Sequence, residues 1–221
     1  MKVLFIVTAY PRHDGDVITP WMGETIDRLI AAGTEVEVLA PSYKGSATSV
    51  IGGVKVHRFR YAPASLETLT HDMPAMERIG RNPAFAALLP LYIAAGSRAA
   101  AKVARDGHFD VVHVFWPIPH GIFGIAAKNA SRAALVSTFF SAELMWRGAT
   151  GTVVEPILKR IVDAQQGTAA AHSQADEEGS FTDINKGFSF RCGFQQEVYH
   201  FSKRSKASAS RASGVPRLIR T

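Results

Sequence analysis

The sequence predicts an α/β domain with a doubly wound, mostly parallel sheet and helices on both of its faces. Short apolar runs rich in branched residues alternate along the chain with longer segments of helical spacing, and glycines or prolines separate them. The 221 residues are 47% hydrophobic, which is enough to bury one core. No internal repeat is visible. We therefore expect one folded domain.

The first three elements form a βαβ unit. Residues 2–8 (KVLFIVT) are a nearly unbroken apolar run, typical of a strand that is covered on both faces. Thr19 and Pro20 supply an N-cap and a first-turn proline for a helix that ends near Gly33. Residues 35–40 (EVEVLA) follow as the second strand. Because βαβ units are right-handed in nearly all cases, this order predicts a doubly wound sheet.

The later segments continue the same alternation. We expect three further strands, the first of them nearer to an edge, at residues 54–60, 110–115 and 135–138. We expect an irregular segment over 62–82, and helices over 82–105 with a kink at Pro90, over 121–130 and over 153–162. Weak strand candidates follow at 168–171 and 187–190. Residues 1–200 are thus predicted to form one Rossmann-like domain.

The charge of the chain is unevenly distributed. Residues 1–179 carry 17 Lys and Arg and 17 Asp and Glu, whereas residues 180–221 carry 8 and 2. The formal net charge of +6 therefore belongs to the C-terminal segment, and we expect no specific nucleic-acid partner for the folded part. Residues 201–221 are read as a basic tail, with disorder expected over 202–213 because Ser, Lys, Arg and Ala bury little apolar surface.

Composition also disfavours secreted and membrane-spanning proteins. The single Cys192 cannot form a disulfide framework, and the opening apolar run has no cleavage pattern of a signal peptide behind it. The uncharged stretch between Arg81 and Arg98 has 16 residues and contains Pro90. A spanning helix needs roughly 20 apolar residues. We expect a cytoplasmic protein whose membrane contact, if any, is peripheral at the inner face.

Several chemistries lack their motifs. The chain has no G-x-G-x-x-G for a dinucleotide, no G-x-x-x-x-G-K-[ST] for a triphosphate and no G-x-S-x-G nucleophile elbow. The histidines have no metal-ligand spacing with one another or with Cys192, so we assign no metal and no cofactor. What remains is a polar cleft at the carboxyl ends of the strands, where open parallel sheets bind ligands.

Loops that follow three predicted strands supply the candidate cleft residues. The first loop contains Asp14, Gly15 and Asp16, which taken alone could also be only a polar turn. The second contains Trp116, His120 and Gly121, an indole and an imidazole where a sugar ring could stack and form hydrogen bonds. Alternatively, Trp116 packs in the core and His120 caps the following helix.

The third loop offers a carboxylate at the start of a helix. Glu143 follows the strand at 135–138, and a helix dipole favours a negative charge at that end. The alternative is that Glu143 only caps the helix. No catalytic residue is assigned from these patterns.

Three segments together resemble the N-terminal domain of retaining glycosyltransferases of family four, which have the two-domain GT-B fold. They are KVLFIVTAYPRHDG with EVEVLAP, then DVVHVFWPIPHG, then LVSTFFSAEL, and the resemblance covers residues 2 to about 201. It implies that the first loop faces the acceptor and the donor phosphates. Further implications are a nucleotide-sugar donor, a glycan or lipid acceptor, transfer without a metal, and a hexosyltransferase type.

Departures from the family pattern lie in the second half of the chain. Phe140 occupies the position where the family commonly has a histidine, and Ser141 the position of a glycine. Phe140 cannot form a hydrogen bond with a sugar hydroxyl. The family's donor-side pair of glutamates, separated by seven residues, is also missing, so the donor-binding half is expected to be absent.

Two hypotheses follow. In the first, the chain is the acceptor-side half of a nucleotide-sugar glycosyltransferase, truncated before the donor domain and inactive alone. In the second, it is a non-catalytic relic or binding module with a Rossmann-like fold. The sequence identifies neither the donor sugar and nucleotide nor the acceptor.

Overall fold

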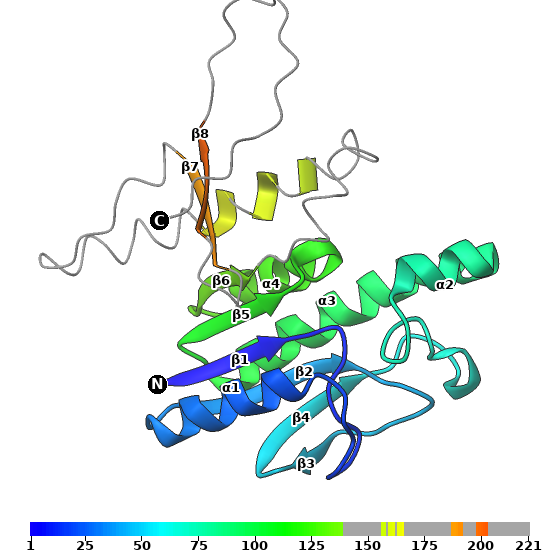
Figure 1. The fold of residues 1–221 in the computed structure, drawn as a ribbon, viewed down its shortest axis with the longest axis horizontal. Coiled ribbons are helices and arrows are strands. Elements are labelled where there is room, and N and C mark those ends of the chain that lie inside the picture. Colours follow the sequence, from blue (N-terminus) through cyan, green and yellow to red (C-terminus); the bar gives the residue numbers. More distant parts are fainter. Residues whose placement is uncertain (139–155, 158, 162, 166–186, 192–197, 203–221) are drawn as a thin grey trace, which may run out of the picture.

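The structure is a computed structural model that describes residues 1–138, 156, 157, 159–161, 163–165, 187–191 and 198–202 (Figure 1). Its main body is a six-stranded sheet with the strand order β3-β4-β2-β1-β5-β6. The strands are β1 (Lys2–Ile6), β2 (Glu35–Pro41), β3 (Ser49–Ile51), β4 (Val54–Phe59), β5 (Val111–Phe115) and β6 (Ala134–Thr138). All neighbours pair in parallel except β3 and β4. This confirms the predicted α/β class.

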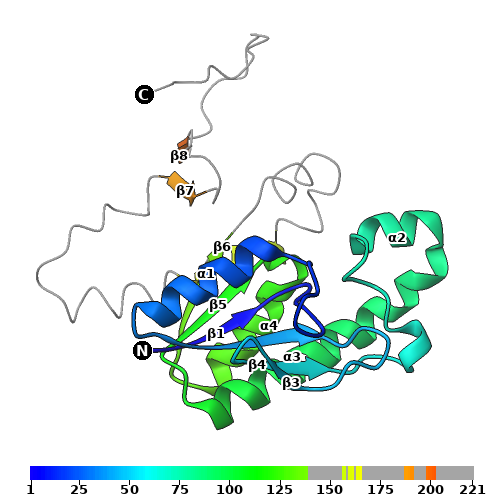
Figure 2. The same cartoon turned by 60° about the horizontal axis from the view of Figure 1, so that its bottom comes forward.

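Helices cover both faces of the sheet. Figure 2 shows α1 (Pro20–Ala31) on one side, and α3 (Leu88–Gly107) and α4 (Pro117–Ala130) on the other. The α1 face of the sheet is lined by apolar residues of β1, β2 and β4 around the buried Ile26. The opposite face packs against α3 and α4 around Tyr92 and Phe123, which are fully buried. Burial on both faces explains why the central strands are almost entirely apolar.

The predicted strand and helix order is confirmed, but several details differ. A hairpin strand, β3, precedes β4 and forms the edge of the sheet. The segment predicted to be irregular contains a short helix, α2 (Ala75–Arg81), after a turn of 3-10 helix at Ala64–Leu66. A second 3-10 segment, Pro83–Ala87, leads into α3, and Asn82 caps it by accepting a hydrogen bond from the Ala84 amide at 3.1 Å.

Three predicted features of the helices differ from the expectation. Pro90 lies in the first turn of α3, where its missing N–H has no partner to lose, so it does not interrupt the helix. Helix α4 is interrupted at Ile118, whose backbone is extended with φ of −108° and ψ of 111°, so the continuous helix begins only a residue or two before the predicted start at Gly121. Thr19 stands at the N-cap of α1, but its side chain makes no capping hydrogen bond because its backbone is left-handed, with φ of 48°.

The C-terminal part is described only in pieces. The described residues between 156 and 165 are helical, in agreement with the predicted helix. A separate antiparallel pair consists of β7 (Gly187–Arg191), which had been a weak strand candidate, and β8 (Val198–Ser202). The strand candidate at 168–171 and the predicted tail beyond residue 202 lie outside the described residues, so the domain boundary stays a prediction.

One helix of the described part, Pro83–Gly107, is long and apolar enough to cross a membrane by length and composition. Tyr92, Gly96, Ala100 and Ala104 lie on one face of it and are buried. This face packs against α4 and belongs to the core of the domain.

Candidate functional site

The strand order fixes where a ligand is expected. The chain runs from β1 outward to β2 and β4, then returns to the other side of β1 to form β5 and β6. The switch in direction therefore lies between β1 and β5, and open α/β sheets bind ligands beyond the carboxyl ends of the strands at such a point. We call this edge of the sheet the carboxyl edge. The loop after β1 and the residues after β5 flank the switch.

The loop after β1 is held by an ion pair between Arg12 and Asp16. The Arg12 Nε lies 2.7 Å from the Asp16 carboxylate, and the Arg12 amide donates to the same carboxylate oxygen at 3.1 Å. The hydrogen bond from the Arg12 side chain holds the pKa of Asp16 below its ordinary value. Only 11% of the Asp16 side chain is exposed, so this carboxylate mainly holds the loop and only a small part of it faces solvent.

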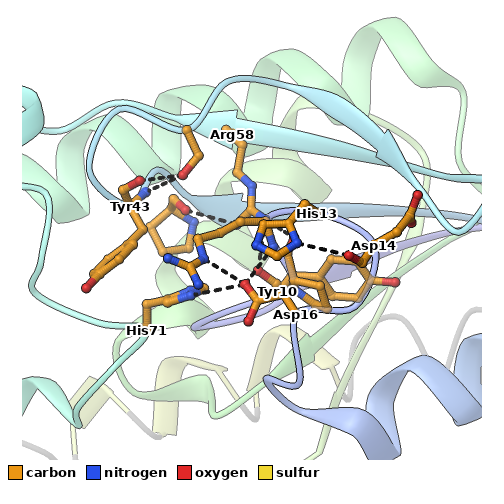
Figure 3. A network of polar contacts seen from close by, with 11 residues as sticks. Tyr10, His13, Asp14, Asp16, Tyr43, Arg58 and His71 are labelled. Carbon is orange, nitrogen blue, oxygen red and sulfur yellow. Dashed lines mark hydrogen bonds and ion pairs between the residues drawn. The ribbon is translucent and has the colours of Figure 1, made fainter.

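A second arginine supports the same loop from the sheet (Figure 3). Arg58, on β4, donates to the carbonyls of Tyr10 at 2.8 Å and of Pro11, and also to the Pro41 carbonyl at the end of β2 at 3.2 Å. Burial lowers the pKa of Arg58 to about 10, which leaves it charged at neutral pH. We call Arg12, Asp16, Arg58 and His71 the charged network.

His71 completes the charged network from the loop after β4. Its Nε2 lies 3.8 Å from the Asp16 carboxylate, and its ring stacks on Tyr43 at 4.4 Å between centroids. The backbone of His71 is in the left-handed region, with φ of 93°, a conformation that costs energy for a residue with a Cβ. Burial lowers the pKa of His71, so its ring is mostly neutral at pH 7.

Asp14 and Gly15 point away from the switch, toward the β3–β4 turn. The Asp14 carboxylate accepts a hydrogen bond from the Gly52 amide at 2.9 Å, and Gly15 provides the positive φ of 86° that the turn of the loop requires. With Asp16, Gly23 and Asp27 they line a shallow pocket of about 190 Å³ between the loop, α1 and the turn. The first predicted loop thus divides, with Asp16 at the carboxyl edge and Asp14 on the side of the domain.

Trp116 and His120 were predicted as neighbours in a sugar-binding lip, and in the structure their side chains have different surroundings. Trp116 follows β5 directly, is partly exposed, and contacts Trp21 edge-on at 5.9 Å between ring centroids. His120 lies one turn into α4 and is 1% exposed. Both of its ring nitrogens have protein partners, Tyr92 at 2.8 Å and the Trp116 carbonyl at 3.0 Å. The alternative of a structural histidine therefore describes His120 better than a direct contact with sugar.

Gly121 has a packing function. A Cβ built on Gly121 would lie 2.3 Å from the Ile161 Cδ1, closer than side-chain atoms approach one another. The glycine therefore lets α4 pack closely against the helical residues between 156 and 165. Gly121 is buried and does not line the carboxyl edge.

The third predicted loop begins at the last described residue of β6. The Thr138 hydroxyl lies 2.8 Å from the His113 Nε2, and its carbonyl accepts a hydrogen bond from the Trp116 amide at 3.3 Å. These contacts tie the end of β6 to the start of α4. Phe140 and Glu143 lie outside the described residues, so their predicted positions in the cleft remain predictions.

Sequence reasoning missed Arg58 and His71, which come from β4 and the loop after it. The alternation VKVHRFR was the available signal, because it places charged residues at a strand end that faces the ligand edge. Nothing in the sequence indicates that Arg58 would reach back over β2 to the loop after β1. Among the described residues, no group of three or more His, Cys, Asp or Glu side chains could hold a metal ion.

A larger depression of about 470 Å³ lies at the opposite edge of the sheet. It is lined by Arg105, His108 and Arg132 near the C-terminal ends of α3 and α4. Basic residues at these positions complement the partial negative charge of the helix ends. We therefore interpret this depression as helix-end packing and not as a ligand site.

Comparison with known proteins agrees with the fold. The sequence matches the family model of Glycosyltransferase Family 4 over residues 21–168, about two thirds of the chain. No curated protein matches it significantly. The matched region includes nearly all of α1, the strands from β2 to β6 and the residues after β5, whereas β1 and the loop after it precede the matched region. Because the match covers more than half of the chain, the chain belongs to glycosyltransferase family 4, as an N-terminal domain of that family.

Proposed function

We propose that this domain is the acceptor side of a glycosyltransferase that transfers a sugar from a nucleotide-sugar donor to a glycan or lipid acceptor. The observation that carries the proposal is the pair of Asp16 and Trp116 on the two sides of the β1/β5 switch in a family-4 domain. A carboxylate and an indole are the side chains that bind sugars best, the first through hydroxyl hydrogen bonds and the second through ring stacking.

The proposed reaction is a hexosyl transfer with retention that needs no metal. In a two-domain GT-B enzyme the donor phosphates are held by a second domain, and the reacting atoms meet between the two. Positioning of two reactants is worth roughly 7 to 11 kcal/mol, and one domain alone forfeits most of it. We therefore expect this chain by itself to bind an acceptor weakly and to transfer no sugar.

A peripheral contact with the inner face of the membrane is part of the proposal, because a lipid acceptor would lie there. The outer end of α3 supports it. Figures 1 and 2 both show α2 beyond this end, away from the sheet. Met76 and Leu91 in this region are about half exposed, and no charged residue lies between Arg81 and Arg98. Such an apolar surface flanked by arginines suits a lipid interface.

The test is a binding experiment on the purified full chain. Saturation-transfer NMR with glucose, N-acetylglucosamine and their disaccharides should detect a Kd on the order of 1 mM, about 4 kcal/mol of binding free energy. Trp116→Ala should weaken binding at least tenfold, whereas Arg28→Ala should not, since Arg28 lies near the far end of α1. In a second arm, phosphatidylcholine vesicles with and without phosphatidylglycerol are sedimented with the chain and with Leu91→Asp.

Two outcomes would contradict the proposal. Saccharide binding that is unchanged by Trp116→Ala would mean that sugars bind elsewhere. Release of nucleoside diphosphate from a nucleotide sugar by the chain alone would mean that one domain suffices for catalysis. Saccharide binding without any transfer, even when a family-4 donor domain is added, would favour the second hypothesis of a non-catalytic module, which the Phe140 departure supports.

A further inference from the structure

Trp116 has a backbone conformation that is unfavourable for a residue with a large side chain. Its φ is 53° and its ψ is 72°, in the left-handed region at the junction of β5 and α4. For a residue with a bulky side chain this conformation is energetically unfavourable. Such strain persists only where the surroundings hold the residue in place. The contacts that hold Trp116 therefore decide where its indole lies at the carboxyl edge.

Hydrogen bonds hold the Trp116 peptide groups on both sides. Its amide donates to the Thr138 carbonyl at the end of β6, at 3.3 Å. Its carbonyl lies 3.0 Å from the Nδ1 of His120, four residues further along the chain. A carbonyl can only accept, so His120 must carry its proton on Nδ1.

The other nitrogen of His120 is then an acceptor, and its partner is Tyr92. The Tyr92 hydroxyl lies 2.8 Å from the His120 Nε2 and donates to it. His120 and Tyr92 are both 1% exposed, so neither bond exchanges with water. Burial lowers the pKa of His120 to about 4 and keeps the ring neutral.

These bonds form one chain with one direction. Tyr92 donates to His120, and His120 donates to the Trp116 carbonyl. We call Tyr92, His120 and Trp116 the neutral relay. The neutral relay runs from the core of the domain to the backbone of Trp116, which lies at the β5 side of the switch.

We propose that His120 is a positioning residue that fixes Trp116 in its left-handed conformation and thereby sets the indole as a stacking surface for the pyranose ring of an acceptor sugar. The sugar part of this inference rests on the proposed function, whereas the positioning part does not. His120 contacts no ligand itself. Its effect passes through a single donated hydrogen bond to the Trp116 carbonyl, and the bond from Tyr92 holds the opposite side of the ring.

Two substitutions separate the two bonds of His120. Asparagine places its amide nitrogen near the Nδ1 position, so His120→Asn keeps a donor for the Trp116 carbonyl and loses the acceptor for Tyr92. Glutamine places its amide oxygen near the Nε2 position, so His120→Gln keeps the acceptor for Tyr92 and loses the donor to Trp116. Both remove the same ring from the core, which makes them a matched pair for stability.

The readout is the indole N–H signal of Trp116 in a ¹⁵N-labelled full chain, assigned by its loss in Trp116→Phe. We expect the signal to stay within its native linewidth in His120→Asn and to shift or broaden in His120→Gln. The backbone amide signals of β3, at the far edge of the sheet, are the internal control. Equal signals in the two variants, or a shift only in His120→Asn, would overturn the proposal.

A milder variant covers the case in which both His120 variants unfold. Tyr92→Phe keeps the shape of the core and removes only the hydroxyl that donates to the His120 Nε2. We expect the Trp116 indole signal to broaden, because one of the two bonds that fix the His120 ring is lost. An unchanged signal would overturn the proposal.

Titration with glucose completes the experiment and tests the sugar part separately. Glucose should perturb the Trp116 indole signal in the native chain and in His120→Asn, and require at least a fivefold higher concentration in His120→Gln. If glucose perturbs no variant while the Asn and Gln signals differ as expected, the positioning stands and the proposed function fails.

Discussion

The charged network and the neutral relay fix the two loops of the carboxyl edge by different physics. In the charged network, Arg12 and Asp16 are partly exposed, and the interactions are ion pairs and donations from guanidinium groups to carbonyls. In the neutral relay every member except Trp116 is buried, and the bonds join uncharged groups. Ion pairs near the surface are screened by salt, whereas buried neutral bonds are not.

This difference suits what each loop would do in a sugar transferase. The loop after β1 would have to approach the donor phosphates, and a loop that carries the partly exposed Arg12 suits an anion. Trp116 would have to present a flat ring in one orientation, and a rigid relay with a fixed tautomer suits that purpose. The two halves of the edge should therefore respond differently to mutation, pH and salt.

The largest expected effect is that of Arg58→Ala in the charged network. The guanidinium donates to the carbonyls of Tyr10, Pro11 and Pro41, and hydrogen bonds to a charged group contribute about 1.5 to 3 kcal/mol each. Because partial rehydration compensates some of this, we expect a loss of about 3 kcal/mol in the free energy of unfolding in urea.

The matched control for Arg58→Ala is Arg28→Ala. The Arg28 side chain is 79% exposed and, within the described part of the chain, pairs only with Glu24, one turn earlier on α1. Its removal should change the free energy of unfolding by no more than about 0.5 kcal/mol. Equal effects of the two substitutions would mean that Arg58 does not support the loop. Arg58→Lys should fall between them, since one ammonium cannot replace a planar fork of donors.

The sheet and its helices follow from the sequence because their signals are local and repeated. Apolar runs such as residues 2–8 identify strands that are buried on both faces, and Pro20 marks a helix start. The strand β3 and the helix α2 were missed for the same reason. Three residues, Ser49–Ile51, carry too short a pattern, and Ala75–Arg81 has no buried residue that would give it helical periodicity.

The site was predictable in position but not in its contacts. The rule for open sheets led from the strand order to the loops of Asp16 and Trp116. It could not distinguish His120 in the core from His120 at the edge, because that depends on where α4 begins. Pro117 and Pro119 both precede His120, and the extended Ile118 between them interrupts the helix, so the continuous part begins directly before His120. Arg58 and His71 depend on contacts between segments more than 40 residues apart, which no local pattern records.

The intermediate effect is that of Tyr92→Phe on stability. The substitution leaves the His120 Nε2 without a donor in the core, and an unsatisfied buried polar group costs about 1 to 3 kcal/mol. We expect a loss of about 1.5 kcal/mol in the free energy of unfolding, equal at 0.05 M and 1 M NaCl, measured in urea. A loss that shrinks at high salt would contradict the neutral character of the relay.

The smallest effect, and the one most sensitive to conditions, is that of Asp16→Asn. Arg12 holds the pKa of Asp16 below its ordinary value in the folded chain, so the carboxylate stabilises the fold at neutral pH. This contribution is fully present above the ordinary carboxyl pKa of about 3.9 and is lost as the pH falls through the lower folded value. The native chain should therefore be more stable than Asp16→Asn at pH 7, and the difference should vanish near pH 2.

Salt provides the second arm of the Asp16→Asn experiment. The Debye length shortens from about 10 Å at 0.1 M to about 3 Å at 1 M, so the difference in stability at pH 7 should narrow in 1 M NaCl. Tyr92→Phe, measured in parallel, should show neither trend between pH 5 and 7, because burial keeps the pKa of His120 at about 4. If Asp16→Asn shows the same loss of stability at every pH and salt concentration, then the loop is supported by the hydrogen bond that the Asp16 side chain accepts from the Arg12 amide, and not by the ion pair.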